Sequence, residues 1–423
     1  MTGGRVQELV GILFVILAFI TGLALIDATK TGGSITPLRS LPAAVLAFPG
    51  LLLTAHVAMR LGAVRADRLI LPLGAFLSTM GLLTLYSLDM SFADQLIWIE
   101  LGLVGAVGTV LVLRRPERLA EFKYLSGTVG VALLMAPIFF GTVRGGSKLW
   151  LVIGGYSFQP AEPAKIFLAI FLAAYLAENK EVLAAGGREF FGISWPRARH
   201  FGPLVVTWLL SLSILILERD LGSSLIFFSL FLLMLYMATG RIAYVTVGLV
   251  LFGAGATVAY RLFSHVADRI DVWLAPLPAD ISGSVYQVAQ SLFALDTGGL
   301  AGAGLGAGLL GRAISMPAVH TDFIFSAMAE ETGLLGAAAV LIAYLLVFAR
   351  GVHAALGARN DFLALLAIGL AGVTVIQAMV IIGGVIKVIP LTGVTLPLIS
   401  YGGSSVVSSF VMFGLLLAIS RRT

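Results

Sequence analysis

The sequence has no cysteine in 423 residues, which excludes a disulfide framework and a thiolate metal site. It has only five histidines, and no two of them have the i,i+4 spacing of a helical metal site. Charged residues make up only 12% of the chain, against roughly 25% in soluble domains, so a water-covered globule is excluded. The net charge of +5 is not gathered in a basic cluster interleaved with aromatic residues, which argues against a nucleic-acid partner.

Long apolar runs dominate instead, since 59% of the residues are hydrophobic. A membrane-spanning helix needs about 20 mostly apolar residues. The first run lacks the basic start and the small-residue cleavage site of a signal peptide, so we interpret it as a retained helix. The sequence predicts an all-α, polytopic transmembrane helix bundle of about twelve spans. These are 9–27, 42–62, 69–88, 95–113, 124–141, 160–177, 203–217, 221–239, 242–262, 323–349, 362–386 and 402–420.

The distribution of Lys and Arg predicts the orientation of the bundle, because positive residues concentrate in cytoplasmic loops. If the N-terminus is inside, 17 of them lie in inside segments and 9 in outside segments. Three of those nine lie at or in the long 263–321 loop, where the rule is weaker. We therefore expect both termini to be cytoplasmic and the 263–321 loop to be extracytoplasmic. Any chemistry at this loop cannot use cytoplasmic ATP.

A glycine-rich run from Gly298 to Gly311 lies in this loop and contains a GxGxxG match from Gly306 to Gly311. No strand precedes the match, no βαβ unit surrounds it and no P-loop Lys-Ser/Thr follows it, so we expect no nucleotide cofactor. We interpret the run as a flexible or re-entrant segment that lines a cavity.

Ionisable residues at membrane depth are costly and usually functional, and two groups stand at the starts of helices. Glu162 and Lys165 share a face at the start of one span, either as a self-neutralising pair or as the wall of a polar cavity. Asp220, beside Glu218 and Arg219, is a suitable N-cap for the next helix, a role that leaves Glu218 and Arg219 unexplained.

Two further groups lie later in the chain. Asp322 enters an apolar helix as either an N-cap or a general base, because a carboxylate at the lip of a cavity can accept a proton. Glu330 and Glu331 lie two to three turns deeper, and we expect one of them to pair with a Lys or Arg of the bundle. Lys387 precedes a Pro-rich and Gly-Ser-rich stretch ending at Ser404 and Ser405. Its exposed amides favour either tight packing or an anion such as pyrophosphate.

Together, these segments resemble the SEDS family of bacterial cell-wall synthesis, which includes RodA, FtsW and SpoVE, from about Arg68 to the C-terminus. The motifs that carry the resemblance are Leu85-Tyr86-Ser87; Gly146, Ser147, Lys148 and Trp150; Gln159-Pro160; Asp220-Leu221-Gly222; Tyr286-Gln287 with Gln290-Ser291; Gly298-Gly299-Leu300; His320 to Phe325 with Glu330-Glu331; and Pro390 to Ser405.

The resemblance implies a ten-helix core over 67–423, preceded by two additional N-terminal helices over 1–66. It also implies an inverting peptidoglycan glycosyltransferase that polymerises lipid II outside the cytoplasmic membrane, in elongation or division, releases polyprenyl pyrophosphate and works with a class B penicillin-binding protein. The family's essential aspartate matches Asp322. The chain departs from the family at Ala318, which replaces a loop glutamate, at Glu218-Arg219, which replaces Gln-Pro, and at Lys148-Leu149, which replaces Arg-Arg.

We therefore expect Asp322 to activate the attacking hydroxyl as a general base, with positive side chains, amides and a divalent cation (Mg²⁺ or Mn²⁺, at an unassigned site) balancing the leaving pyrophosphate. Lys165 is also a candidate to keep Asp322 ionised. The other expected substrate contacts are Lys165, Glu162, Lys148, Arg219, Gln290, Ser404 and Ser405, and the expected charge network is Glu330, Glu331, Asp220 and Lys387.

Two other functions remain open at this stage. A flippase for the same lipid-linked precursor would also use broken helices and midplane charges, although no inverted repeat is visible. A scaffold that recruits a transpeptidase would need no acid and base in one cavity.

Overall fold

The computed structural model describes residues 3–32, 43–62, 66–90, 92–144, 147–185, 188–190, 193–195, 220–274, 283–310, 316 and 318–421, with a few single residues between 202 and 213. The expected sites Arg219 and Glu218, and the predicted span 203–217 apart from those single residues, lie outside this part of the chain.

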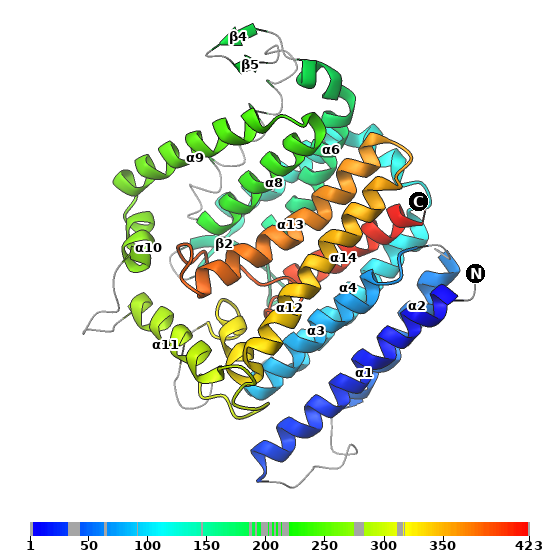
Figure 1. Ribbon diagram of the computed structural model, residues 1–423, viewed down its shortest axis with the longest axis vertical. Coiled ribbons are helices and arrows are strands. Elements are labelled where there is room, and N and C mark those ends of the chain that lie inside the picture. Colours follow the sequence, from blue (N-terminus) through cyan, green and yellow to red (C-terminus); the bar gives the residue numbers. More distant parts are fainter. Residues whose placement is uncertain are drawn as a thin grey trace. The chain divides into compact units, whose positions relative to one another are not determined.

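The described chain is mainly helical (Figure 1). Its helices are α1 (Gly3–Lys30), α2 (Ala43–Gly62), α3 (Ile70–Ser87), α4 (Phe92–Val112), the 3₁₀ helix η2 (Pro116–Phe122), α5 (Lys123–Phe140), α6 (Ala161–Ala185), α8 (Leu221–Thr239), α9 (Ile242–Leu262), α10 (Ser264–Leu274), α11 (Gly283–Gly298), α12 (Ile324–Leu356), α13 (Asp361–Val385) and α14 (Gly403–Ser420). Its short strands are β1 (Thr142–Arg144), β2 (Ser147–Ile153), β3 (Tyr156–Phe158), β4 (Arg188–Phe190) and β5 (Ile193–Trp195), which form an antiparallel β1-β2-β3 sheet and an antiparallel β4-β5 hairpin.

Each predicted span except 203–217 coincides with a helix. Within the described residues, nine helices are long and apolar enough to cross a membrane. The predicted polytopic helix bundle is therefore confirmed. The 263–321 loop contains structure that periodicity did not predict, because α10 and α11 lie within it.

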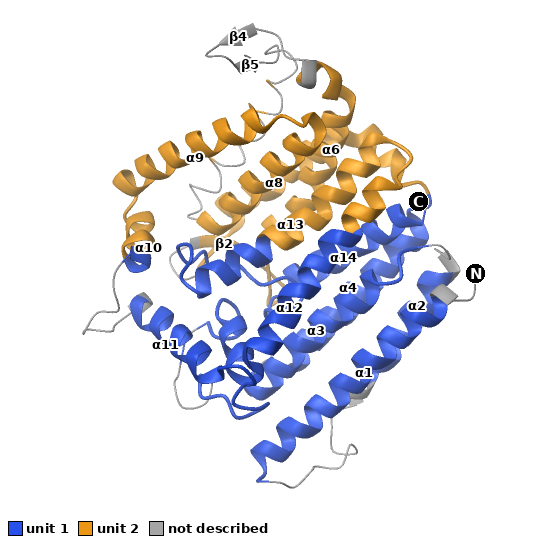
Figure 2. Cartoon of the chain, in the orientation of Figure 1, with its two compact units in different colours: residues 1–114, 272–350, 377–421 blue, residues 115–271, 351–376, 422–423 orange. Residues whose placement is uncertain are grey.

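The chain divides into two compact units, coloured separately in Figure 2. The first unit comprises 1–114, 272–350 and 377–421, and in it α1 packs on α3, α2 on α4, and α4 on α14. The second comprises 115–271, 351–376 and 422–423, and in it α5 packs on α6, α6 on α8, and α8 on α9. The predicted division into 1–66 and 67–423 stays a prediction.

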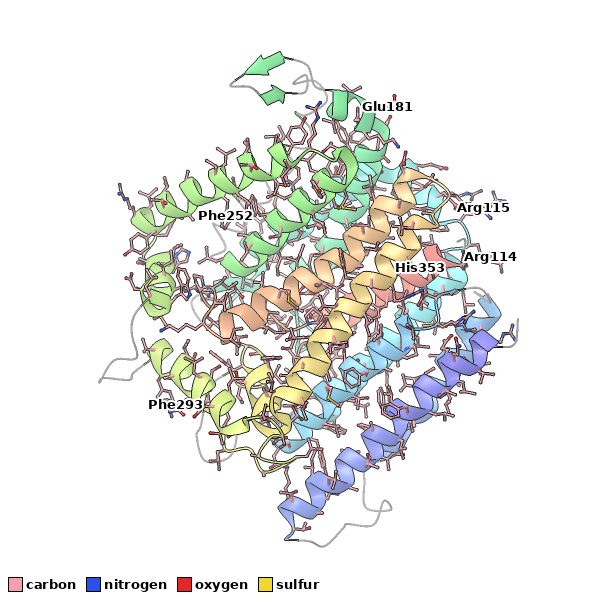
Figure 3. All side chains as sticks on the ribbon, in the orientation of Figure 1. Arg114, Arg115, Glu181, Phe252, Phe293 and His353 are labelled. Atoms are coloured by element: carbon pink, nitrogen blue, oxygen red, sulfur yellow. The ribbon has the colours of Figure 1, made fainter. Side chains whose placement is uncertain are left out.

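Small residues allow helices within the first unit to approach closely, as expected where lipid gives no hydrophobic driving force between helices. A methyl group added at Gly102 of α4 would come within 2.6 Å of the Phe410 ring on α14. One added at Gly414 would come within 2.8 Å of the Ala106 carbonyl oxygen. Outward-facing positions are apolar instead: Phe293 of α11 and Phe252 of α9, both labelled in Figure 3, are exposed.

Candidate active site

Asp322 lies in a tight turn immediately before α12 and is partly buried. The turn is built around the Ala318 carbonyl oxygen, which accepts the backbone N–H groups of Thr321 (3.2 Å) and Asp322 (3.0 Å). Ala318 has a φ of +59°, a left-handed conformation that is uncommon for a residue with a Cβ. From Phe323 to Glu331 every side chain is buried. The turn therefore places one partly exposed carboxylate at the end of a buried helix.

A second segment fixes this turn from the other side. The Ser400 hydroxyl donates to the Thr321 carbonyl oxygen (2.6 Å), and the Tyr401 N–H donates to the His320 carbonyl oxygen (2.9 Å). Ser400 itself is oriented because its oxygen accepts the Leu396 N–H (2.8 Å). The backbone on the N-terminal side of Asp322 is consequently held by two hydrogen bonds from a segment about 80 residues further along the chain.

Gln95 of α4 supports that segment and was not identified from the sequence. Its side chain is fully buried; its Nε2 donates to the Ser400 carbonyl oxygen (3.0 Å) and its Oε1 accepts the Gly402 N–H (3.2 Å). A glutamine in the first turn of a mainly apolar span was the available signal. Gln95 thus connects α4, through Ser400, to the turn that carries Asp322.

Replacing Gln95 with Leu leaves a buried carbonyl and a buried N–H unpaired, each costing about 1–3 kcal/mol. We expect the thermal midpoint to fall, and kcat to fall about tenfold to a hundredfold with little change in KM, because a small misplacement of a catalytic group is costly. Gln377→Leu is the matched control, since Gln377 is also buried but donates to the Thr395 carbonyl oxygen (2.7 Å) rather than to Ser400. If both variants lose stability and kcat equally, Gln95 has no positioning role.

α12 is broken at Gly333, whose backbone (φ 66°, ψ −169°) is not helical. The glycine-rich segment, residues 298–310, pairs with the break. Ala303 and Gly304 donate their N–H groups to the carbonyl oxygens of Glu330 (2.9 Å) and Glu331 (3.1 Å). On the far side of the break, the N–H groups of Leu334 and Leu335 donate to carbonyl oxygens of the same segment, at Gly299 (2.9 Å) and Leu300 (3.2 Å). These four hydrogen bonds pair backbone groups on both sides of the break, as irregular backbone at membrane depth requires.

The Glu330 and Glu331 side chains fasten the glycine-rich segment as well. Glu330 accepts the N–H groups of Leu309 (2.9 Å) and Leu310 (3.0 Å), and Glu331 accepts the hydroxyl of Ser87 on α3. Backbone N–H groups of Gly306 and Gly308 also bond to Glu331. The expected pairing of one of the two with a Lys or Arg stays a prediction. A carboxylate can be satisfied by amide donors as well as by a cation, and the run of free N–H groups in the glycine-rich segment supplies them.

His320, two residues before Asp322, is half-buried, and its Nδ1 has no hydrogen-bond partner among the described residues. Its ring lies 5.6 Å from the Tyr401 ring, centroid to centroid. Burial lowers the pKa of His320 below its ordinary value of 6.5. The imidazole is therefore neutral at neutral pH.

This shift predicts a loss of stability in mild acid. As pH falls below 6.5, the unfolded chain binds the proton before the folded chain does, so the free energy of unfolding decreases until the pH passes the lowered folded pKa of His320. We expect the thermal midpoint to drop between pH 7.5 and pH 5.5, and His320→Gln to reduce that drop. His353→Gln is the control because His353 is exposed (Figure 3). An equal drop in all three proteins would contradict the assignment.

The other expected residues of the first unit are Gln290, Ser404, Ser405 and Lys387. Gln290 of α11 is partly buried beside Ser291, whose hydroxyl lies 2.6 Å from that of Ser326 on α12. Ser404 and Ser405 are buried at the start of α14, where Gly403 packs against Trp98 and the Gly402 N–H is already used by Gln95. Lys387 occupies a left-handed position after α13. A pyrophosphate contact at Ser404 and Ser405 stays a prediction.

The second unit contains the remaining expected residues. Lys165 and Glu162 form an ion pair, with 2.8 Å between Nζ and Oε2, and both side chains are buried. Lys148 of β2 donates to the carbonyl oxygen of Ile138 near the end of α5 (2.5 Å). Asp220 is the N-cap of α8, accepting the Ser223 N–H (2.9 Å), and burial raises its pKa.

Comparison with known proteins places the chain in a family. The profile named for FtsW, RodA and SpoVE, described as "Cell cycle protein", matches residues 67–423. Peptidoglycan glycosyltransferase RodA of Mycobacterium leprae is 40% identical over 89% of this chain and 82% of its own length. The protein of the same name from Mycobacterium tuberculosis H37Rv is 37% identical over 99% of this chain and 90% of its own.

A solved structure agrees with the sequence relatives. The crystal structure of the rod shape determining protein RodA of Thermus thermophilus superposes with a TM-score of 0.59 at 26% identity, covering 84% of this chain and 97% of that one. The match to a polytopic helical protein supports the membrane bundle, and the expectation of a cell-wall glycosyltransferase is confirmed by the names of the relatives. The chain belongs to the FtsW, RodA and SpoVE family of membrane proteins, the SEDS family that its motifs resemble.

Proposed function

We propose that this peptidoglycan glycosyltransferase polymerises lipid II into glycan strands at the outer face of the cytoplasmic membrane, with Asp322 as the general base. One observation carries the assignment of Asp322. It is a partly exposed carboxylate before an otherwise buried helical stretch, held by a turn of its own and by Ser400 and Tyr401. Enzymes keep catalytic groups in place with this kind of supporting shell.

In the proposed reaction, the 4-hydroxyl of the acceptor sugar attacks the anomeric carbon of the donor from the face opposite the pyrophosphate. A new C–O bond forms, the bond between the anomeric carbon and the pyrophosphate oxygen breaks, and the configuration inverts. The hydroxyl proton passes to the Asp322 carboxylate, and polyprenyl pyrophosphate leaves with the electron pair. Asp322 returns to its ionised form by releasing the proton to water.

The leaving pyrophosphate needs positive charge as it departs. From the sequence, the candidates for that role are Lys165 first and then Lys148, with Arg219 as a further candidate outside the described residues. The described residues contain no group of three His, Asp or Glu side chains able to hold a metal ion alone. Mg²⁺ is usually bound by one or two carboxylates together with substrate phosphates, so a divalent cation would be held mainly by the pyrophosphate itself.

The orientation and the partner belong to the same proposal. We place both termini in the cytoplasm, because the predicted inside segments hold the excess of Lys and Arg. The partner is a class B penicillin-binding protein, a transpeptidase that would crosslink the strands this enzyme makes. A flippase remains the alternative, since the break in α12 at Gly333 is a feature that transporters also use.

The chemistry of the product tests the proposal. Purified protein with its transpeptidase partner should convert lipid II into strands whose new linkages are all inverted, releasing one polyprenyl pyrophosphate for each linkage. Retained configuration would rule out a single displacement with Asp322 as base. Strand formation without release of polyprenyl pyrophosphate would contradict the assigned leaving group.

A further inference from the structure

A cavity of about 390 Å³ lies within the first unit, beside the glycine-rich segment. Its walls come from α1 (Ala18, Thr21 and Leu25), from α3 (Leu83), from the glycine-rich segment and from α12. The volume falls in the range of small-molecule sites, about 300–1,000 Å³. α1 precedes residue 67, where the family profile begins.

The polar groups in the walls are already used. The hydroxyls of Thr21, Thr84 and Thr332 donate to carbonyl oxygens of their own helices, at 2.8 Å, 2.9 Å and 2.7 Å. Glu331, the one ionisable residue of the lining, accepts the Ser87 hydroxyl. Most of the remaining lining side chains are apolar, among them Leu25, Leu83 and Met328, so the walls offer a ligand mainly dispersion contacts.

The cavity also has an open side. Thr21 and Leu25 line the cavity, and both are also exposed on the outside of α1. The exposed fraction of Leu25 is 56%. Both belong to the apolar stretch Arg5–Lys30, which is long enough to span a membrane. The neighbouring outward residues of α1, Phe14 and Leu17, are 68% and 60% exposed, as lipid-facing side chains are. The opening along α1 therefore faces hydrocarbon.

From these observations we propose that the cavity binds one acyl chain of a membrane phospholipid. A mainly apolar pocket that opens to the bilayer is filled by the apolar groups around it rather than by water. A phospholipid is favoured over the polyprenyl chain of the substrate, because the proposed base Asp322 is not among the residues that line the cavity. The proposal goes beyond the glycosyltransferase activity and does not depend on it.

The bound chain would connect α1 to the support of the active-site helix. Gly304 and Leu305 of the glycine-rich segment contribute to the cavity wall, and Gly306 lies so close to α1 that an added methyl group would come within 3.2 Å of Ile26. The same segment holds the break in α12. Occupancy of the cavity would therefore stabilise the glycine-rich segment in its paired position.

Photolabelling of full-length protein in proteoliposomes tests this site. The probe is a phosphatidylglycerol with a diazirine at the end of one acyl chain, and labelled positions are mapped by mass spectrometry. We expect labels on α3 near Leu83 and on α12 near Met328 in the wild type. Thr21→Trp, which narrows the opening, should reduce that labelling at least fivefold, while Leu17→Trp, on the same exposed face but outside the lining, should not.

Size-exclusion profiles and thermal midpoints establish whether each variant is folded. If Thr21→Trp does not fold, Leu25→Trp serves as a second variant that blocks the opening. Thr21→Val should label like the wild type, because the Thr21 hydroxyl bonds to its own helix. The proposed site would be overturned if the wild type carried no label on α3 and α12. It would also be overturned if Thr21→Trp were labelled as strongly as the wild type. Displacement of the probe by equimolar polyprenyl phosphate but not by unlabelled phospholipid would overturn the phospholipid assignment.

Discussion

Replacing Asp322 with Asn should lower the rate of lipid II polymerisation by about 10²–10⁴-fold, the usual cost of losing a general base. Asparagine keeps the size and most of the hydrogen-bonding capacity of the side chain but cannot take the proton of the attacking hydroxyl. The turn is held by hydrogen bonds to the Ala318 carbonyl oxygen and by hydrogen bonds that Ser400 and Tyr401 donate. None of these bonds involves the Asp322 carboxylate, so they should persist in the variant. The expected signature is therefore a folded protein with lost kcat and nearly unchanged thermal midpoint.

The matched control is Asp296→Asn, which removes a carboxylate from an exposed position on α11. Strand formation is measured from labelled lipid II by gel separation of the glycan products. Wild-type rates in Asp322→Asn would exclude a base at this position. Equal losses in both variants would assign the effect to net charge.

A second large effect is expected at Gly302. Its φ of +87° is unfavourable for any residue with a Cβ, and the added methyl group would overlap the Glu331 carbonyl oxygen. Backbone strain and overpacking together cost roughly 2–6 kcal/mol, a large part of the 5–15 kcal/mol that typically stabilises a domain. Gly302→Ala should separate the glycine-rich segment from the break in α12. Both the thermal midpoint and polymerisation should then be reduced.

Gly299→Ala separates the effect of the steric overlap with Glu331 from the effect of the backbone strain. Gly299 also has a positive φ, +50°, but a methyl group there meets no atom within 4 Å. Its variant should lose only the strain component, about 1–3 kcal/mol, and keep most of the activity. If the two variants behave alike, contact between the glycine-rich segment and α12 does not support the active site.

Local sequence information was sufficient for the helices and for the candidate base. Apolar runs of the required length predicted a helix at each described span, although α1, α6 and α12 extend further than predicted at one end, because composition indicates which segments are buried in lipid but not where each helix stops. Asp322 was identifiable because one carboxylate beside a buried helix is unusual. The same reasoning found Glu162 and Lys165, whose pairing follows from their i,i+3 spacing.

Contacts between residues distant in sequence could not be predicted. Gln95 and Ser400 are 305 residues apart, and Ser87 and Glu331 are 244 apart. No local pattern specifies such pairs, since they depend on how helices assemble. The partners of Glu330 could not be predicted for the same reason, because its donors are backbone amides of a segment that the sequence marked only as glycine-rich. α10 and α11 were missed because, at 11 and 16 residues, they are shorter than the run of about 20 residues that a membrane span needs.

The most direct test of the central claim measures two outcomes in one sample. Proteoliposomes containing wild-type protein or Asp322→Asn, with the transpeptidase partner, are supplied with fluorescent lipid II in the outer leaflet, and both glycan strands and lipid II transfer between leaflets are quantified. The account predicts strands from the wild type, almost none from the variant, and no transfer above protein-free vesicles with either. Transfer by both proteins without strand formation would contradict it and identify a flippase.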